Sequence, residues 1–220
     1  MKVLYQFPNS AAFGKMLAKS KIYEYATPAS KVKELFVSQV EKITWAYKLS
    51  PATINLPASE NVREIQVFHI ALRSGILASE ILQTIDKAIP SPILFLLEHE
   101  NRCRYVAAYK QPREVDKNKW VISSYFETDW ISNALEKAAM PVVLNMAALY
   151  HFFLKEIIAL PFRKDESLDE LILRGDELKN KKCEASTLSN RIKKEKQFNR
   201  RVELNQTLNA LKQEIENLKR

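Results

Sequence analysis

Glycine and proline are both missing from the 45 residues that follow Gly175, and this feature constrains the C-terminal part of the chain most strongly. Because no helix-breaking residue occurs there, the segment predicts one long helix, or two helices joined by a tight turn. From Leu204 onwards, apolar residues step by four and three positions, which is the spacing of a heptad seam. The seam consists of Leu204, Leu208, Leu211, Ile215 and Leu218. An upstream repeat of seven, from Leu171 to Ile192, does not join this register, so we expect a break across Glu195 to Val202.

The seam needs a cover, because each leucine left in water instead of being buried costs roughly 1.5–3 kcal/mol. Three covers are compatible with the sequence: the upstream half of the tail folded back as a hairpin, the same helix of a second chain, and another protein. We expect a helical hairpin or a homodimer in preference to a foreign partner.

The same tail carries most of the positive charge. The stretch from Lys179 to Arg201 contains nine basic residues and only two acidic ones, Glu184 and Glu195, in a chain whose net charge is +8. Such a stripe is typical of a surface that binds DNA or another polyanion, since lysine and arginine release condensed counterions from phosphates. A solvated helix face is the alternative. The predicted nucleic-acid-binding residues are Lys179, Lys181, Lys182, Arg191, Lys193, Lys194, Lys196, Arg200 and Arg201.

The residues before the tail alternate between helical and strand patterns. Ser10 could cap a short helix that ends at Leu17, and Thr27-Pro28 opens a second helix whose apolar residues recur every three or four positions as far as Tyr47. Residues 76–89 and the uncharged run 138–154 predict two more helices, and strands are expected at 64–72, 93–97, 102–109 and 120–126. We therefore predict an α+β fold: a small mixed four-stranded sheet with helices packed on it in residues 1–165, followed by a basic helical tail in 166–220.

Several classes of protein are disfavoured by composition. Three glycines in the whole chain are too few for the glycine-rich phosphate loop of nucleotide-binding folds. Cys103 and Cys183 have no paired spacing, which fits a reducing cytoplasm. The first residues lack the apolar stretch of a signal peptide, and 138–154 is shorter than the roughly 20 apolar residues of a membrane helix. We expect a cytoplasmic protein with no membrane contact.

Residues suited to catalysis or metal binding form no familiar pattern. His69, His99 and His151 are isolated, and none has a second ligand three or four positions away on a shared face, as a metal site on a helix would show. We therefore predict no metal, no cofactor and no catalytic residues. One enzymatic alternative uses the set Glu60, Glu64, Asp86, Glu98 and Lys110, in which Glu64 and Glu98 would hold magnesium as in restriction-type nucleases. The lysine that such nucleases carry two residues after the carboxylate is Gln66 here, and glutamine cannot replace it.

Five segments together resemble a bacterial family of unknown function over nearly the whole chain. They are 43–49 (ITWAYKL), 64–68 (EIQVF), 85–90 (IDKAIP), 128–130 (TDW) and 194–205 (KEKQFNRRVELN). The resemblance implies a charged helical tail, and a gene placed beside a helicase and a DNA methyltransferase in restriction-like or phage-defence loci. It carries over no catalytic residue.

The sequence therefore predicts a non-enzymatic accessory module of a restriction-like or defence complex. Its body would bind a helicase or DNA methyltransferase, and its tail would contact nucleic acid or brace the assembly. A magnesium-dependent nuclease and a purely structural coiled-coil adaptor are the alternatives.

Overall fold

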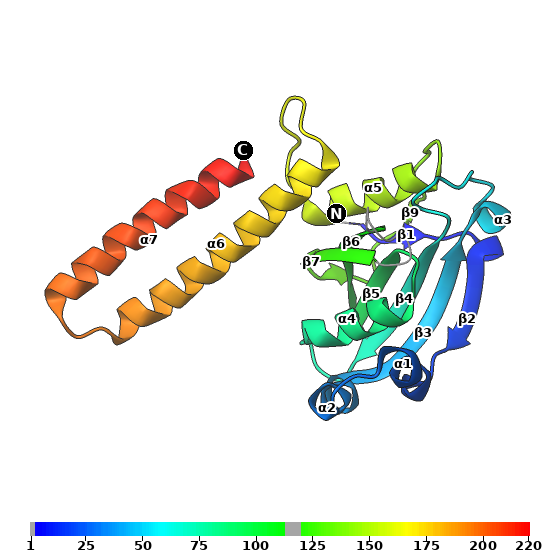
Figure 1. Ribbon diagram of the computed structural model, residues 1–220, viewed down its shortest axis with the longest axis horizontal. Coiled ribbons are helices and arrows are strands. Elements are labelled where there is room, and N and C mark those ends of the chain that lie inside the picture. The colour runs from blue at the N-terminus through cyan, green and yellow to red at the C-terminus, as the bar shows by residue number, and fades with distance from the viewer. Residues whose placement is uncertain (1–2, 113–119) are drawn as a thin grey trace. The chain divides into compact units, whose positions relative to one another are not determined.

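The computed structural model describes residues 3–112 and 120–220, and the chain divides into two compact units, residues 1–157 and 158–220. The first unit is a mixed sheet covered by helices, and the second contains two long helices (Figure 1). None of the helices in the described ranges is both long enough and apolar enough to span a membrane.

A seven-stranded sheet organises the first unit. Its strands run in the order β2-β3-β4-β5-β6-β7 (Figure 1), and β8 pairs with Arg102 and Cys103 of β6. All neighbours are antiparallel except β4 and β5, which are parallel because helix α4 connects them as a crossover. The bounds are β2 Ala12–Met16, β3 Val40–Leu49, β4 Ile65–Leu72, β5 Ile93–His99, β6 Arg102–Pro112, β7 Trp120–Glu127 and β8 Ile131–Ser132. A separate parallel pair joins β1 Tyr5–Gln6 to β9 Ala138–Ala139.

Helices cover both faces of this sheet. One face packs on α1 Lys19–Ala26, α2 Ser30–Gln39 and α4 Ser79–Ala88, through a core that includes Phe36, Phe68, Ile81 and Phe95. On the other face, the ring of Tyr5 contacts both Tyr105 of β6 and Phe153 of α5 Met146–Ile158. A 3-10 helix, η1 Asn9–Ala11, and a short helix, α3 Pro51–Ile54, complete the unit.

The α+β class is confirmed, but the predicted size of the sheet is wrong, since it has seven strands and not four. The largest error is in residues 28–47, where the helix ends at Gln39 and Val40–Leu49 form β3. Register shifts in β3 made the helical spacing misleading: Val40, Ile43 and Trp45 pair with Leu72, Ile70 and Phe68 on one face, whereas Tyr47 pairs with Val67 on the other. Residues 12–16 likewise form an edge strand and not the helix expected from Ser10.

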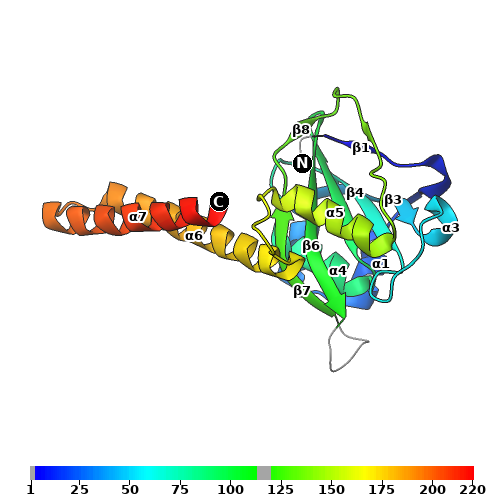
Figure 2. The same ribbon diagram turned by 90° about the horizontal axis from the view of Figure 1, so that it is seen from above.

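The second unit is an antiparallel hairpin of α6 Leu168–Lys194 and α7 Phe198–Lys219 (Figure 1, Figure 2). A capping box opens α6: the Ser167 hydroxyl accepts from the Glu170 amide, and the Glu170 carboxylate accepts from the Ser167 amide. The helix runs through Gly175 without interruption and ends before Glu195, so the expected break lies at 195–197.

Candidate nucleic-acid interface

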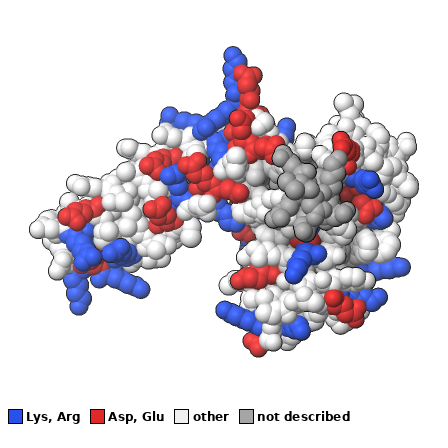
Figure 3. Space-filling model, viewed as in Figure 1, with Lys and Arg blue, Asp and Glu red and all other residues white. Residues whose placement is uncertain are grey.

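The turn between α6 and α7 gathers six of the predicted basic residues. Arg191, Lys193 and Lys194 lie in the last turn of α6, Lys196 lies in the connection, and Arg200 and Arg201 follow at the start of α7. All six are exposed, and Figure 3 shows lysine and arginine side chains clustered at this end of the hairpin. We call these six residues, together with Phe198, the basic tip.

One carboxylate lies within the basic tip. Glu195 Oε2 is 3.7 Å from Arg200 Nε, and its Oε1 accepts a hydrogen bond from the Gln197 amide at 3.0 Å. These contacts, with the nearby charges of Arg200 and Arg191, hold the pKa of Glu195 below its usual range, and the hydrogen bond from Gln197 is the largest cause. A single ionised carboxylate leaves five of the six positive charges of the turn without compensation from residues 191–201.

An aromatic side chain stands among these cations. Phe198 is the first residue of α7 and is 74% exposed. A phenylalanine inside a hairpin seam would be buried, so packing within the second unit does not account for this side chain.

The other three predicted basic residues lie nearer the start of α6, and one of them, Lys181, is paired with acidic residues. Lys182 is nine residues before Arg191, which corresponds to about 13 Å along a helix. Lys181 Nζ lies 2.6 Å from Glu214 Oε2 and 3.8 Å from Glu177 Oε1, and its hydrogen bond to Glu214 raises the pKa of the lysine. Lys179, Lys181 and Lys182 therefore form a group of their own, outside the basic tip.

The leucine seam of the tail is covered by the same chain. Leu208, Leu211 and Ile215 are buried, and Leu211 and Ile215 form a small core with Leu178 of α6. Leu160, Ala185 and Leu218 pack around that core, while Leu204 is half-buried. This arrangement corresponds to the hairpin alternative, and a homodimer through α7 stays a prediction.

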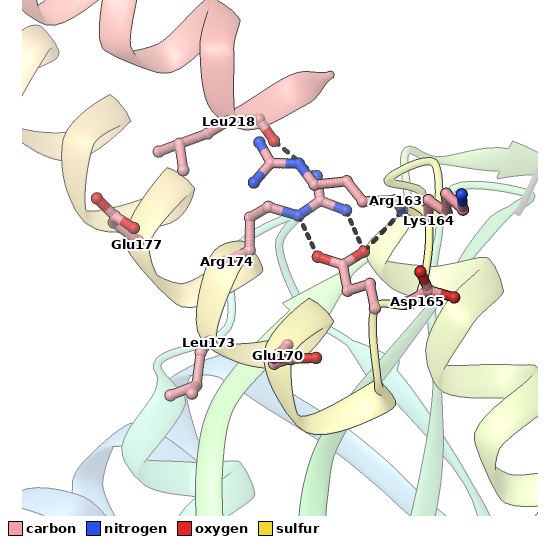
Figure 4. A pocket seen from close by; sticks show the side chains of 9 residues that line it. Arg163, Lys164, Asp165, Glu170, Leu173, Arg174, Glu177 and Leu218 are labelled. Carbon is pink, nitrogen blue, oxygen red and sulfur yellow. Dashed lines mark hydrogen bonds and ion pairs between the residues drawn. The ribbon is translucent and has the colours of Figure 1, made fainter.

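A surface hollow of about 390 Å³ lies at the opposite end of the hairpin (Figure 4). Its central group is Arg174, whose Nε and Nη2 donate to the two carboxylate oxygens of Glu166 at 2.6 and 2.7 Å. The same guanidinium donates to the carbonyls of Leu218 at 2.7 Å and Pro161 at 2.6 Å. Because these bonds fix the loop before α6 and the end of α7, Arg174 acts as a structural clamp.

The two carboxylates of the nuclease alternative are not brought together. Ala71 of β4 pairs with Glu98 of β5, and Glu64 lies seven residues before Ala71, so the two carboxylates stand at opposite ends of parallel strands. At about 3.3 Å per residue, this places them roughly 23 Å apart. Glu64 is also engaged locally, by Lys48 Nζ at 2.8 Å and by the side chains of Gln66 and Ser91. The proposed magnesium pair is therefore wrong.

Two other residues considered for the nuclease alternative, Asp86 and Lys110, form a buried network. Lys110 Nζ donates to the backbone oxygen of Asp86 at 2.8 Å and lies 3.3 Å from its Oδ1, while the Tyr125 hydroxyl donates to Oδ2. Burial raises the pKa of Asp86 and lowers that of Lys110. The network lies inside the core and has no access to a substrate.

One group in the described ranges has side chains suited to holding a metal ion. Ligand atoms of His69, Glu98 and Cys103 all lie within 4.8 Å of one another. The pKa of the Cys103 thiol is raised to about 11 by burial and by the negative charge of Glu98, so this cysteine is not an activated nucleophile. Sequence reasoning missed the group because its members come from three different strands and share no local spacing.

Residues 6–215 match the family described as Domain of unknown function (DUF4391). The chain belongs to this family. Neither the curated proteins nor the solved structures include a match. Membership in DUF4391 agrees with the resemblance noted in the sequence, and it supplies no reaction, ligand or partner.

Proposed function

We propose that this DUF4391 protein binds nucleic acid through the basic tip of its C-terminal hairpin. The observation that carries the proposal is the gathering of six exposed cations around one turn, with one glutamate among them. Phosphates compensate such a cluster, since each neutralised phosphate releases condensed counterions.

The charges at the start of α7 support a ligand more strongly than those at the end of α6. Arg191, Lys193 and Lys194 lie at a helix C-terminus, where the helix dipole favours positive charge, and they need no further explanation. Arg200 and Arg201 lie in the first turns of α7, which has no acidic residue in its first turn. A cation there opposes the dipole by about 0.3–1 kcal/mol, and a bound phosphate would remove this cost.

The exposed ring of Phe198 indicates which form of nucleic acid is preferred. Bases stack on aromatic side chains when they are unpaired, and such stacking contributes about 1–3 kcal/mol per base. Because Phe198 stands between Lys196 and Arg200, one unpaired base could stack while its flanking phosphates meet the cations. We expect tighter binding to single strands than to duplexes of the same length.

An accessory role beside a helicase or a DNA methyltransferase is the wider form of this proposal. It is supported by the sequence resemblance, and the division of the chain into two compact units is compatible with one unit binding a partner and the other binding DNA. A pull-down from the native host identifies the partner, and recovery of neither enzyme class would contradict this wider form.

Binding of a labelled single-stranded oligonucleotide, followed by fluorescence anisotropy across a salt series, tests the central proposal. The test variant replaces Lys193, Lys194, Lys196, Arg200 and Arg201 by glutamine. If each contacts one phosphate, the negative slope of log K against log salt should become less steep by about 3.5 for single strands.

The control variant makes the same change in charge on the first unit, at the exposed residues Lys21, Lys31, Lys42, Arg63 and Arg73. We expect this control to keep the wild-type slope. Equal losses of affinity in both variants would show that net charge alone is responsible. Absence of binding by the intact protein at low salt would contradict the proposal and favour the structural coiled-coil adaptor.

A further inference from the structure

Three metal-binding side chains meet on one face of the sheet in the first unit. Glu98 of β5 pairs directly with Cys103 of β6, so both side chains point to the same face. His69 of β4 pairs with Leu96, two residues before Glu98, which places the imidazole on that face as well. The register of β4, β5 and β6 thus holds the three side chains together without help from a flexible loop.

The distances fit a shared ion. His69 Nε2 and Glu98 Oε2 are 2.6 Å apart, and every pair of the three ligand atoms lies within 4.8 Å. With bonds of about 2.0–2.3 Å to a tetrahedral zinc ion, ligand atoms stand roughly 3.3–3.8 Å apart, so His69 and Glu98 would have to separate by roughly 1 Å to admit the ion. The simpler interpretation is a hydrogen-bonded His69–Glu98 pair, in which a proton occupies the place that the metal would take.

The donor chemistry selects a class of metal. One imidazole nitrogen, one carboxylate oxygen and one thiolate sulfur suit zinc and related transition metals, whereas magnesium and calcium require oxygen ligands. A thiolate and a carboxylate also neutralise a divalent ion. Cys103 is 4% exposed, whereas the side chains of His69 and Glu98 are 30% and 35% exposed, so solvent reaches one side of the group. A fourth ligand can come from that side.

A supporting residue stands beside the three. Asn133 Nδ2 donates to Glu98 Oε1 at 3.1 Å, and the backbone N–H of Asn133 donates to the carbonyl of Asn101 at 2.9 Å. Its Oδ1 is buried and has no hydrogen-bond donor in the part of the chain that is described. Outer residues that orient a metal-bound carboxylate have this position, and a metal-bound water would supply the donor that Oδ1 lacks.

We propose that His69, Glu98 and Cys103 bind a zinc-class divalent ion, with water as the fourth ligand and Asn133 orienting Glu98. This site lies in the first unit and is independent of the basic tip, so either proposal can fail alone.

Titration of the full-length, metal-free protein with Co²⁺ tests the site, because cobalt reports its own ligands in the absorption spectrum. We expect one ion per chain, a thiolate-to-cobalt charge-transfer band, and the intense visible bands of a four-coordinate ion. Zn²⁺ should displace the cobalt and abolish both signals.

Variants assign the ligands. Cys103→Ser should abolish the charge-transfer band, whereas Cys183→Ser, which changes the exposed cysteine of α6, should keep it. His69→Gln and Glu98→Gln alter partly exposed side chains, so these variants should fold normally by circular dichroism and bind at least about 100-fold more weakly, beyond the effect of an outer residue. Asn133→Ala should weaken binding by about 10-fold.

Two outcomes would overturn the proposal. The first is a charge-transfer band that survives in Cys103→Ser and disappears in Cys183→Ser. The second is binding that is not stoichiometric, or that is unchanged in His69→Gln and Glu98→Gln, which would identify an adventitious ion only.

Discussion

Replacing Arg174 by methionine removes the clamp at the open end of the hairpin while keeping the apolar stem of the side chain. In the wild type, the guanidinium makes two bonds to the Glu166 carboxylate and two to the carbonyls of Pro161 and Leu218. The two charged side chains are only 5% and 6% exposed. Without Arg174, the Glu166 carboxylate keeps only the hydrogen bond from the Arg163 amide and the charge of Arg163. Breaking a buried ion pair in this way costs up to about 3–5 kcal/mol.

Native-state hydrogen exchange of the α6 and α7 amides measures this cost locally. Since each 1.4 kcal/mol corresponds to a factor of ten, the protection of these amides should fall by about two to three and a half orders of magnitude. Arg163→Met is the matched control, because the Arg163 guanidinium makes one exposed hydrogen bond to the Asn217 carbonyl at the same end of α7. It should cost at most about 1.5 kcal/mol.

The double variant Arg174→Met with Glu166→Gln separates charge burial from packing. Without the unpaired carboxylate, it should recover a substantial part of the protection lost in the single variant. If Arg174→Met costs no more than Arg163→Met, the assignment of Arg174 as the clamp is wrong.

Acidification should weaken the hairpin through Glu166. Its pKa is lowered chiefly by the hydrogen bonds from Arg174, so the ionised carboxylate stabilises the folded state above the usual glutamate pKa of about 4.3, and this stabilisation disappears as pH falls through the lowered value. Urea midpoints of the wild type should therefore fall more steeply below about pH 4 than those of Glu166→Gln. In the first unit, Lys110→Met should cost about 3–5 kcal/mol by leaving the Asp86 carboxylate buried and unpaired, whereas the exposed control Lys21→Met should stay within about 0.5 kcal/mol by urea unfolding. Phe198→Ala should weaken single-strand binding by about 1–3 kcal/mol, whereas Tyr25→Ala, at 76% exposure, should leave anisotropy titrations unchanged.

Local patterns were sufficient for the tail and insufficient for the sheet. The break at 195–197 follows from two heptad registers that do not join, and both registers can be read along the chain. The strand Val40–Leu49 has apolar spacing that fits a helix, and it becomes a strand because β2 and β4 pair with it on either side. That pairing is a long-range property, and no window around Ile43 contains it.

The candidate sites also differ in whether local sequence patterns can predict them. The basic tip could be foreseen because its cations are close in sequence, although the structure separates Lys179, Lys181 and Lys182 from it. The group of His69, Glu98 and Cys103 depends on the register of three strands, and the same register places Glu64 far from Glu98. A sequence shows which residues are present, whereas strand register decides which of them meet.

Residue-by-residue protection of lysines from acetylation by a bound oligonucleotide tests most directly whether the basic tip is the nucleic-acid interface. With mass spectrometry as the readout, Lys193, Lys194 and Lys196 should lose reactivity when a single-stranded oligonucleotide is bound at low salt. The exposed lysines of the first unit, Lys21, Lys31 and Lys42, should react as they do in the free protein. Protection of the first-unit lysines with unchanged reactivity at 193–196 would contradict the account.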